Sequence, residues 1–157
     1  MKAETKKCIR ILSWILFILY LILLMYFLFF SEWYGRKNWI EEDYRYNLVL
    51  FKEIGRFWTY REQLGMEAVL LNLVGNIIGF LPFGFILPVI SKRTRRFWIT
   101  GLLGFLMSLF VECLQLAGKV GCFDVDDLLL NTAGALSGYL FFLICNGIRR
   151  WYYEKKI

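Results

Sequence analysis

Four long apolar segments limit this chain of 157 residues to very few folds. A helix needs about 20 apolar residues to cross a bilayer, and the candidate spans are residues 11–30, 69–90, 98–116 and 128–148. The third span carries a single charged residue, Glu112, and the other three carry none. We therefore predict an all-α integral membrane protein, a bundle of four transmembrane helices that forms one domain over residues 1–157.

The amino-acid composition agrees with a membrane protein and excludes several other classes. Apolar residues make up 59% of the chain, whereas soluble domains contain roughly 45–50%. The chain has no histidine, which excludes a Ser-His-Asp triad and a histidine-ligated metal site. A disordered chain is excluded because the apolar content is too high.

Basic residues indicate how the bundle is oriented. They flank the spans in three short clusters, at positions 2–10, 92–96 and 149–156. Because lysine and arginine favour cytoplasmic loops, we predict that both termini are cytoplasmic. Segments 31–68 and 117–127 then lie outside. The net charge of +6 is thus a signal of orientation, and no nucleic-acid partner is expected.

The long outer segment ends in an amphipathic stretch. At helical spacing its apolar residues share one face, whereas its charged residues lie opposite; the apolar set is Leu50, Phe51, Ile54, Phe57 and Trp58. Such a helix can rest in the plane of the membrane interface or pack on the outer ends of the bundle. We predict an interfacial amphipathic helix between the first and second spans.

Polar residues inside spans are costly and therefore need an explanation. Stripes of polar residues at helical spacing occur in the second and third spans and at the start of the fourth, which two aspartates precede. The residues are Asn72, Asn76, Glu112, Gln115, Asp124, Asp127 and Asn131. With the predicted orientation, all three stripes lie near the outer surface. We therefore predict that these seven residues form one polar pocket that opens to the outer face.

A purely structural interpretation also accounts for part of this pattern. Asparagine and glutamine link membrane helices by hydrogen bonds, and Asp127 could cap the fourth span. Close helix contacts are expected at Gly75 and Gly79 and at Gly134 and Gly138, which are small residues four apart. Neither effect explains Glu112, because the C-terminal end of a helix disfavours an anion.

The carboxylates suggest two kinds of chemistry. Glu112, Asp124, Asp126 and Asp127 could hold a hard cation through oxygen ligands, or a buried carboxyl could act as a general acid or base. The spacing fits no EF-hand or similar pattern, so we assign no metal and no cofactor. Glu112 and Asp127 are the candidate catalytic residues if the protein is an enzyme.

Three motifs in this order resemble the VanZ-like family of bacterial membrane proteins. They are Asn72-x3-Asn76-x5-Pro82-x-Gly84, Glu112-x2-Gln115 and Asp124-x2-Asp127-x3-Asn131-x2-Gly134. Residues 46–51 also resemble the segment that precedes the second span of the family. The resemblance covers roughly residues 45–140.

This resemblance implies a multi-pass protein of the bacterial cytoplasmic membrane with a link to teicoplanin resistance. The expected function is a low-level resistance factor that acts at the outer face on a lipoglycopeptide or a lipid-linked cell-wall precursor. The alternative is a membrane enzyme that modifies a lipid or a lipid-linked envelope precursor. Besides the lipid bilayer, a second copy of the chain is left open as a partner.

Overall fold

The computed structural model describes residues 3–30 and 44–155 and contains four long helices. They are α1 (Ala3–Phe30), α4 (Met66–Ile90), α5 (Phe97–Ala117) and α6 (Val125–Glu154). Each is long and apolar enough to cross a membrane, which confirms the predicted fold class. Residues 31–43, the first part of the predicted outer segment, lie outside the described residues.

The helices extend beyond the predicted spans. α1 begins at Ala3, and α6 continues to Glu154, in both cases through charged residues. The difference arises because hydropathy marks where a helix leaves the bilayer core, whereas the helix itself ends where its backbone hydrogen bonds end.

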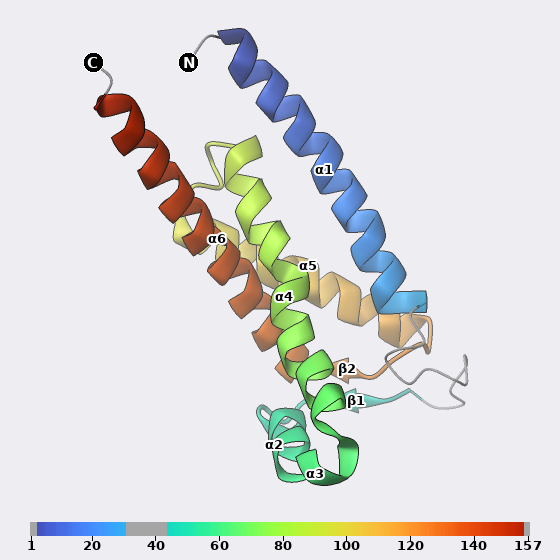
Figure 1. Cartoon of the computed structure of the whole chain (residues 1–157). Coiled ribbons are helices and arrows are strands. Elements are labelled where there is room, and N and C mark those ends of the chain that lie inside the picture. Colours follow the sequence, from blue (N-terminus) through green and yellow to red (C-terminus); the bar gives the residue numbers. More distant parts are fainter. Residues whose placement is uncertain (1–2, 31–43, 156–157) are drawn as a thin grey trace.

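Short elements cover one end of the bundle. α2 (Lys52–Thr59) and α3 (Arg61–Leu64) lie there, together with β1 (Tyr46–Asn47) and β2 (Phe123–Asp124), which pair in parallel. We call this end the sheet end. Figure 1 shows that the first turn of α1 and the last turns of α6 both lie at the opposite end.

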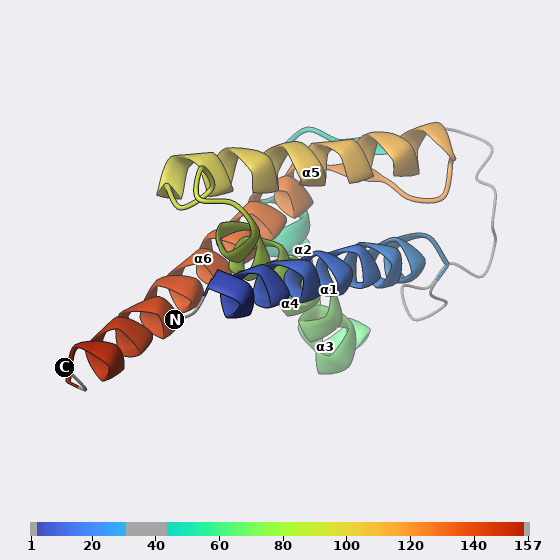
Figure 2. The ribbon, with the colours of Figure 1, turned by 90° about the horizontal axis from the view of Figure 1, so that it is seen from above.

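α4 and α6 form the centre of the bundle. They share the most extensive helix contact, and Figure 2 shows α5 and α1 on opposite sides of this pair. α1 is the most peripheral of the four, because Phe17 and Leu24 are its buried residues among the side chains that the structure describes.

Glycines allow α4 and α6 to touch backbone to backbone. A Cβ on Gly138 would lie 1.9 Å from the carbonyl oxygen of Leu81, and one on Gly134 would lie 2.2 Å from that of Ile77. The predicted close contact of Gly134 and Gly138 is thus confirmed. On α4 the closest approach to α6 is at Gly84. The predicted close contact at Gly79 is wrong, because a Cβ there would meet only a side-chain atom of Leu24 of α1 at an ordinary distance.

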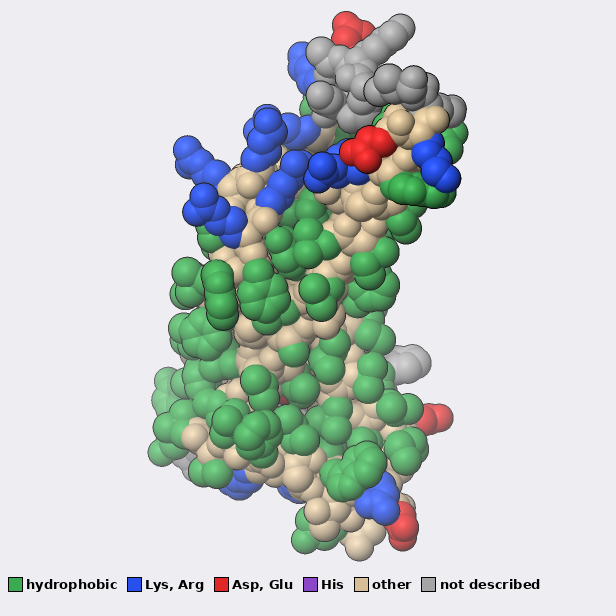
Figure 3. Space-filling model, turned by 90° about the vertical axis from the view of Figure 1, so that its left-hand side faces the viewer, with side chains coloured by type: hydrophobic (Ala, Val, Ile, Leu, Met, Phe, Trp, Pro, Cys, Tyr) green, Lys and Arg blue, Asp and Glu red, His purple; other side chains and the backbone are tan. Residues whose placement is uncertain are grey.

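Charge is distributed unevenly along the bundle. Figure 3 shows lysine and arginine side chains gathered at the end that carries the termini, and apolar side chains around the middle. The predicted helix 50–58 corresponds to α2, which lies against α4 and α6 at the sheet end. Its apolar residues Phe51 and Trp58 remain exposed.

Candidate functional site

The parallel pair β1–β2 brings two distant polar residues together at the start of α6. Asn47 is paired in register with Asp124, and its Nδ2 donates to Oδ1 of Asp124 at 3.0 Å. The same Oδ1 accepts the backbone N–H of Asp126 at 2.8 Å, which makes Asp124 the N-cap of α6. The suggestion that Asp127 caps this helix is therefore corrected.

Glu112 is explained by the loop that follows its helix. The side chain is buried, and its Oε2 accepts the backbone N–H of Asp124 at 3.0 Å. This bond ties the loop between α5 and α6 to the end of α5. Glu112 thus positions the residue that caps α6.

The carboxylate of Asp126 accepts three backbone N–H groups at the sheet end. Its side chain is 1% exposed; Oδ1 accepts the backbone N–H of Phe51, and Oδ2 accepts those of Glu53 and Ile54 at 2.9 and 3.1 Å. Phe51, at the N-cap of α2, has left-handed backbone geometry (φ 64°) and no side-chain cap. Asp126 therefore caps α2 from another helix. An acceptor at this place also interacts favourably with the positive, N-terminal end of the dipole of α2.

The other polar residues link the long helices to one another. Asn76 of α4 donates to Oδ1 of Asp127 of α6, and Asn131 of α6 donates to Oγ of Ser108 of α5 at 2.9 Å. Gln115 of α5 donates to the carbonyl of Leu28 of α1 at 3.0 Å. These bonds are of the kind that holds membrane helices together.

Asn72 does not join this network, and Ser108 was missed by the sequence interpretation. Nδ2 of Asn72 donates to the carbonyl of Ala68, one turn earlier in its own helix. Ser108 lies four residues before Glu112 and hence on the same helix face. This spacing could have assigned Ser108 to the polar stripe of the third span. Asn47 and Asp126 had no comparable signal, because their partners belong to other elements.

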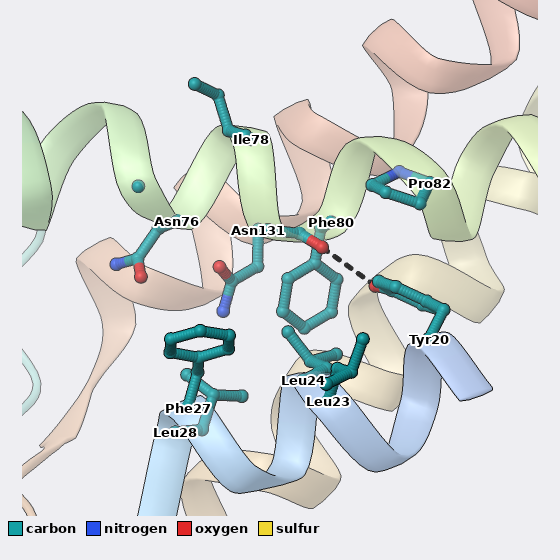
Figure 4. A pocket seen from close by; sticks show the side chains of 12 residues that line it. Tyr20, Leu23, Leu24, Phe27, Leu28, Asn76, Ile78, Phe80, Pro82 and Asn131 are labelled. Carbon is teal, nitrogen blue, oxygen red and sulfur yellow. Dashed lines mark hydrogen bonds between the residues drawn. The ribbon is translucent and has the colours of Figure 1, made fainter. Parts of the chain in front are cut away.

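A cavity of about 280 Å³ lies between α1 and α4. Its walls are mainly apolar, and they include two of the seven predicted pocket residues, Asn76 and Asn131. Figure 4 shows these two side chains beside Phe27, with Phe80 and Leu24 further along the cavity. Glu112, Gln115, Asp124, Asp127 and Asn72 are not part of its wall.

The carboxylates of the sheet end do not converge on one point. Among the residues that the structure describes, no group of three or more acidic or cysteine side chains is placed to hold a metal ion. Glu112, Asp124 and Asp126 instead accept backbone N–H groups. The geometry therefore describes a network that anchors loops and helix ends.

Burial raises the pKa of Asp124 above its ordinary value of 3.8, and the neighbouring Asp126 adds to this effect. The contribution of Asp124 to stability is therefore full below that value and is lost as the pH rises through the raised pKa. Both hydrogen bonds to Asp124 end on Oδ1, so an asparagine can keep them.

We expect Asp124→Asn to cost less than about 1 kcal/mol at neutral pH, because the uncharged amide keeps both hydrogen bonds. Its stability relative to wild type should improve as the pH rises from acidic to neutral. Melting temperatures of both proteins across this pH range test the prediction. A difference that is constant, or that grows against the variant, would contradict it.

The four spans and their buried polar links define a multi-pass helical membrane protein whose helices are joined by hydrogen bonds between polar side chains. The family model described as VanZ/LLP1 matches residues 17–146, and the chain belongs to this family. It is 29% identical over 146 residues to Protein VanZ of Enterococcus faecium, a match that covers 87% of this chain and 77% of that protein. No solved structure matches the chain. The family resemblance of the sequence motifs is thereby confirmed, as is a multi-pass location in a bacterial membrane.

Proposed function

We propose that the chain acts as one VanZ-like membrane domain that lowers susceptibility to teicoplanin-type lipoglycopeptides. It does so at the outer face of the cytoplasmic membrane, by binding a lipoglycopeptide or a lipid-linked cell-wall precursor. Membership of the VanZ/LLP1 family supports the link to resistance. The mechanism is binding rather than chemistry.

The orientation follows from the basic residues. The first turn of α1, the last turns of α6 and the loop between α4 and α5 lie opposite the sheet end. This loop carries Lys92, Arg93, Arg95 and Arg96. Because positive residues favour the cytoplasmic side, the sheet end is the outer end. The polar links of α4, α5 and α6 then lie in the outer half of the membrane.

The observation that carries the proposal is the position of Asn76 and Asn131. Both are buried and line an apolar cavity, and both belong to the network at the sheet end. A site with an apolar wall and few polar groups is typical of ligand pockets. At this depth it can receive the lipid part of a molecule whose polar part stays in water.

A membrane enzyme is the second candidate, and Asp127 supports it. This half-buried carboxylate accepts a hydrogen bond from Asn76, a residue of the cavity wall, so one side chain links it to the space where a molecule would bind. Glu112 is a weaker candidate, because it is buried and accepts the backbone N–H of Asp124. We assign Glu112 a structural role, which is to position Asp124.

Susceptibility of a sensitive Gram-positive host tests the proposed function. We expect the wild type to raise the inhibitory concentration of teicoplanin but not that of vancomycin. Asp127→Asn can still accept the hydrogen bond from Asn76, so loss of most of the protection would show that the carboxyl group itself is required. The exposed Glu67→Gln, at matched membrane levels, is the control and should protect fully.

Each other outcome has a definite meaning. Lack of protection by the wild type would refute the resistance role. Full protection by Asp127→Asn would make Asp127 a structural residue and remove the main support for an enzyme. A change in the lipid or precursor profile that depends on the Asp127 carboxylate would favour the enzyme over the binding factor.

A further inference from the structure

We propose that the cavity between α1 and α4 binds one acyl chain, and that an amide N–H at the polar end of that chain donates to Oδ1 of Asn131. The ligand class is thus an N-acylated amphiphile. The inference deepens the proposed function and rests on it for one point, the placement of the cavity in the outer leaflet.

The cavity opens sideways toward lipid. Leu23, Phe27 and Ile78 line it and are about half exposed or more, whereas Leu24 and Phe80 line it and are buried. All five are apolar. In a membrane the exposed residues face acyl chains, so one chain can enter between α1 and α4 without crossing a polar surface.

An unpartnered acceptor marks where the polar end of the ligand belongs. Asn131 is 2% exposed, and its Oδ1 is a buried side-chain atom with no hydrogen-bond partner among the described residues. Its Nδ2 is already used by Ser108. Leaving a buried acceptor unpaired is costly, and a donor is therefore needed at this point of the wall.

Water is a poor partner for this oxygen. An ordered buried water usually makes about three hydrogen bonds, but the cavity wall is mainly apolar. The Nδ2 of Asn76, the other side-chain amide in this wall, already donates to Asp127. Tyr20, another wall residue, already donates its hydroxyl to the carbonyl of Gly79. An N-acylated ligand meets both needs, because its amide N–H donates to Oδ1 of Asn131 while its acyl chain fills the apolar space.

The size of the cavity limits the ligand. Its volume of about 280 Å³ is just below the roughly 300–1,000 Å³ of ligand pockets that enclose drug-sized molecules. One acyl chain with its linking amide is compatible with this space, whereas a glycopeptide core or a sugar headgroup is too large. The larger part of an amphiphile must remain outside the cavity, at the membrane surface.

Photolabelling of the purified full chain in nanodiscs of ether-linked phosphatidylcholine tests the site. The probe is a secondary decanamide with a diazirine at the end of its chain. We expect labelling of α1 and α4 at the cavity wall, and loss of this labelling in Leu23→Trp, which fills the entrance. Leu19→Trp is the matched control, because Leu19 is similarly exposed one turn earlier and does not line the cavity.

The role of Asn131 is tested with a second probe, the N-methyl form of the same amide, which has no N–H. The wild type should prefer the secondary amide by about tenfold, as expected for one buried hydrogen bond. Asn131→Leu should bind both probes equally. Equal binding of the two probes by the wild type, or undiminished labelling of Leu23→Trp, would overturn the inference even if Asn131→Leu does not fold.

Competition experiments identify which molecule supplies the acyl chain. Displacement of the probe by teicoplanin, but not by vancomycin, which has no lipid tail, would assign the site to the antibiotic. Displacement by a bacterial lipid extract alone would assign it to a membrane lipid. Probe binding without teicoplanin protection in cells would refute the proposed function and keep the cavity site, whereas protection without labelling at the cavity would do the reverse.

Discussion

Gly138→Ala is expected to prevent stable packing of α4 on α6. The new Cβ would lie 1.9 Å from the carbonyl oxygen of Leu81 and 2.9 Å from the backbone N of Phe85. Both atoms belong to helix backbone, so no side-chain rotation relieves the clash. Overpacking costs about 1–3 kcal/mol where side chains can adjust. We expect Gly138→Ala to lower the free energy of unfolding by an amount at or above the upper end of this range.

The yield and melting temperature of the purified variant in detergent measure this effect. Gly147→Ala is the matched control, because Gly147 lies in the same helix and a Cβ there meets no atom within 4 Å. Alanine is the better helix former by roughly 0.5–1 kcal/mol, so the control should be as stable as wild type or more so. Similar melting of the two variants would contradict the backbone contact.

Asp126→Asn is expected to release α2 from the bundle. Both carboxylate oxygens accept backbone N–H groups at the start of α2, and an asparagine would present an NH₂ group to at least one of these donors. Unpaired buried groups cost about 1–3 kcal/mol each, so we expect Asp126→Asn to lower the free energy of unfolding by about 3 kcal/mol. Asp124→Asn should cost far less, because its hydrogen bonds use one oxygen only.

Hydrogen exchange locates the effect. In Asp126→Asn the amides of Phe51, Glu53 and Ile54 should lose protection, whereas the amides in the middle of α5 should keep theirs. The exposed Glu67→Gln is the control for the loss of one acidic charge at the sheet end. Unchanged protection of the three α2 amides would show that Asp126 does not hold this helix.

The spans and the polar stripes could be predicted because each depends on one segment at a time. The apolar length of 69–90 identifies α4 by itself, and the spacing of Glu112 and Gln115 places both on one face. The close contact at Gly134 and Gly138 was predicted for the same reason, since two small residues four apart always share a helix face.

Contacts between distant segments could not be predicted. Asp126 stands in an acidic run with Asp124 and Asp127, and the sequence does not tell that it faces the start of α2. The partner of Asn47 follows from the register of β1 on β2, two strands of two residues each. Such short strands leave no pattern in the sequence. The cavity likewise depends on how α1 lies against α4, which hydropathy does not determine.

The orientation of the sheet end is the point on which the proposed function depends. It can be measured with an impermeant maleimide on intact cells, in a background where Cys8, Cys113, Cys122 and Cys145 are replaced by serine. Glu62→Cys places a thiol in α3 at the sheet end, and Arg93→Cys places one in the basic loop between α4 and α5. We predict labelling of Glu62→Cys in intact cells and of Arg93→Cys only after permeabilisation. The reverse pattern would place the polar network on the cytoplasmic side and contradict an action at the outer face.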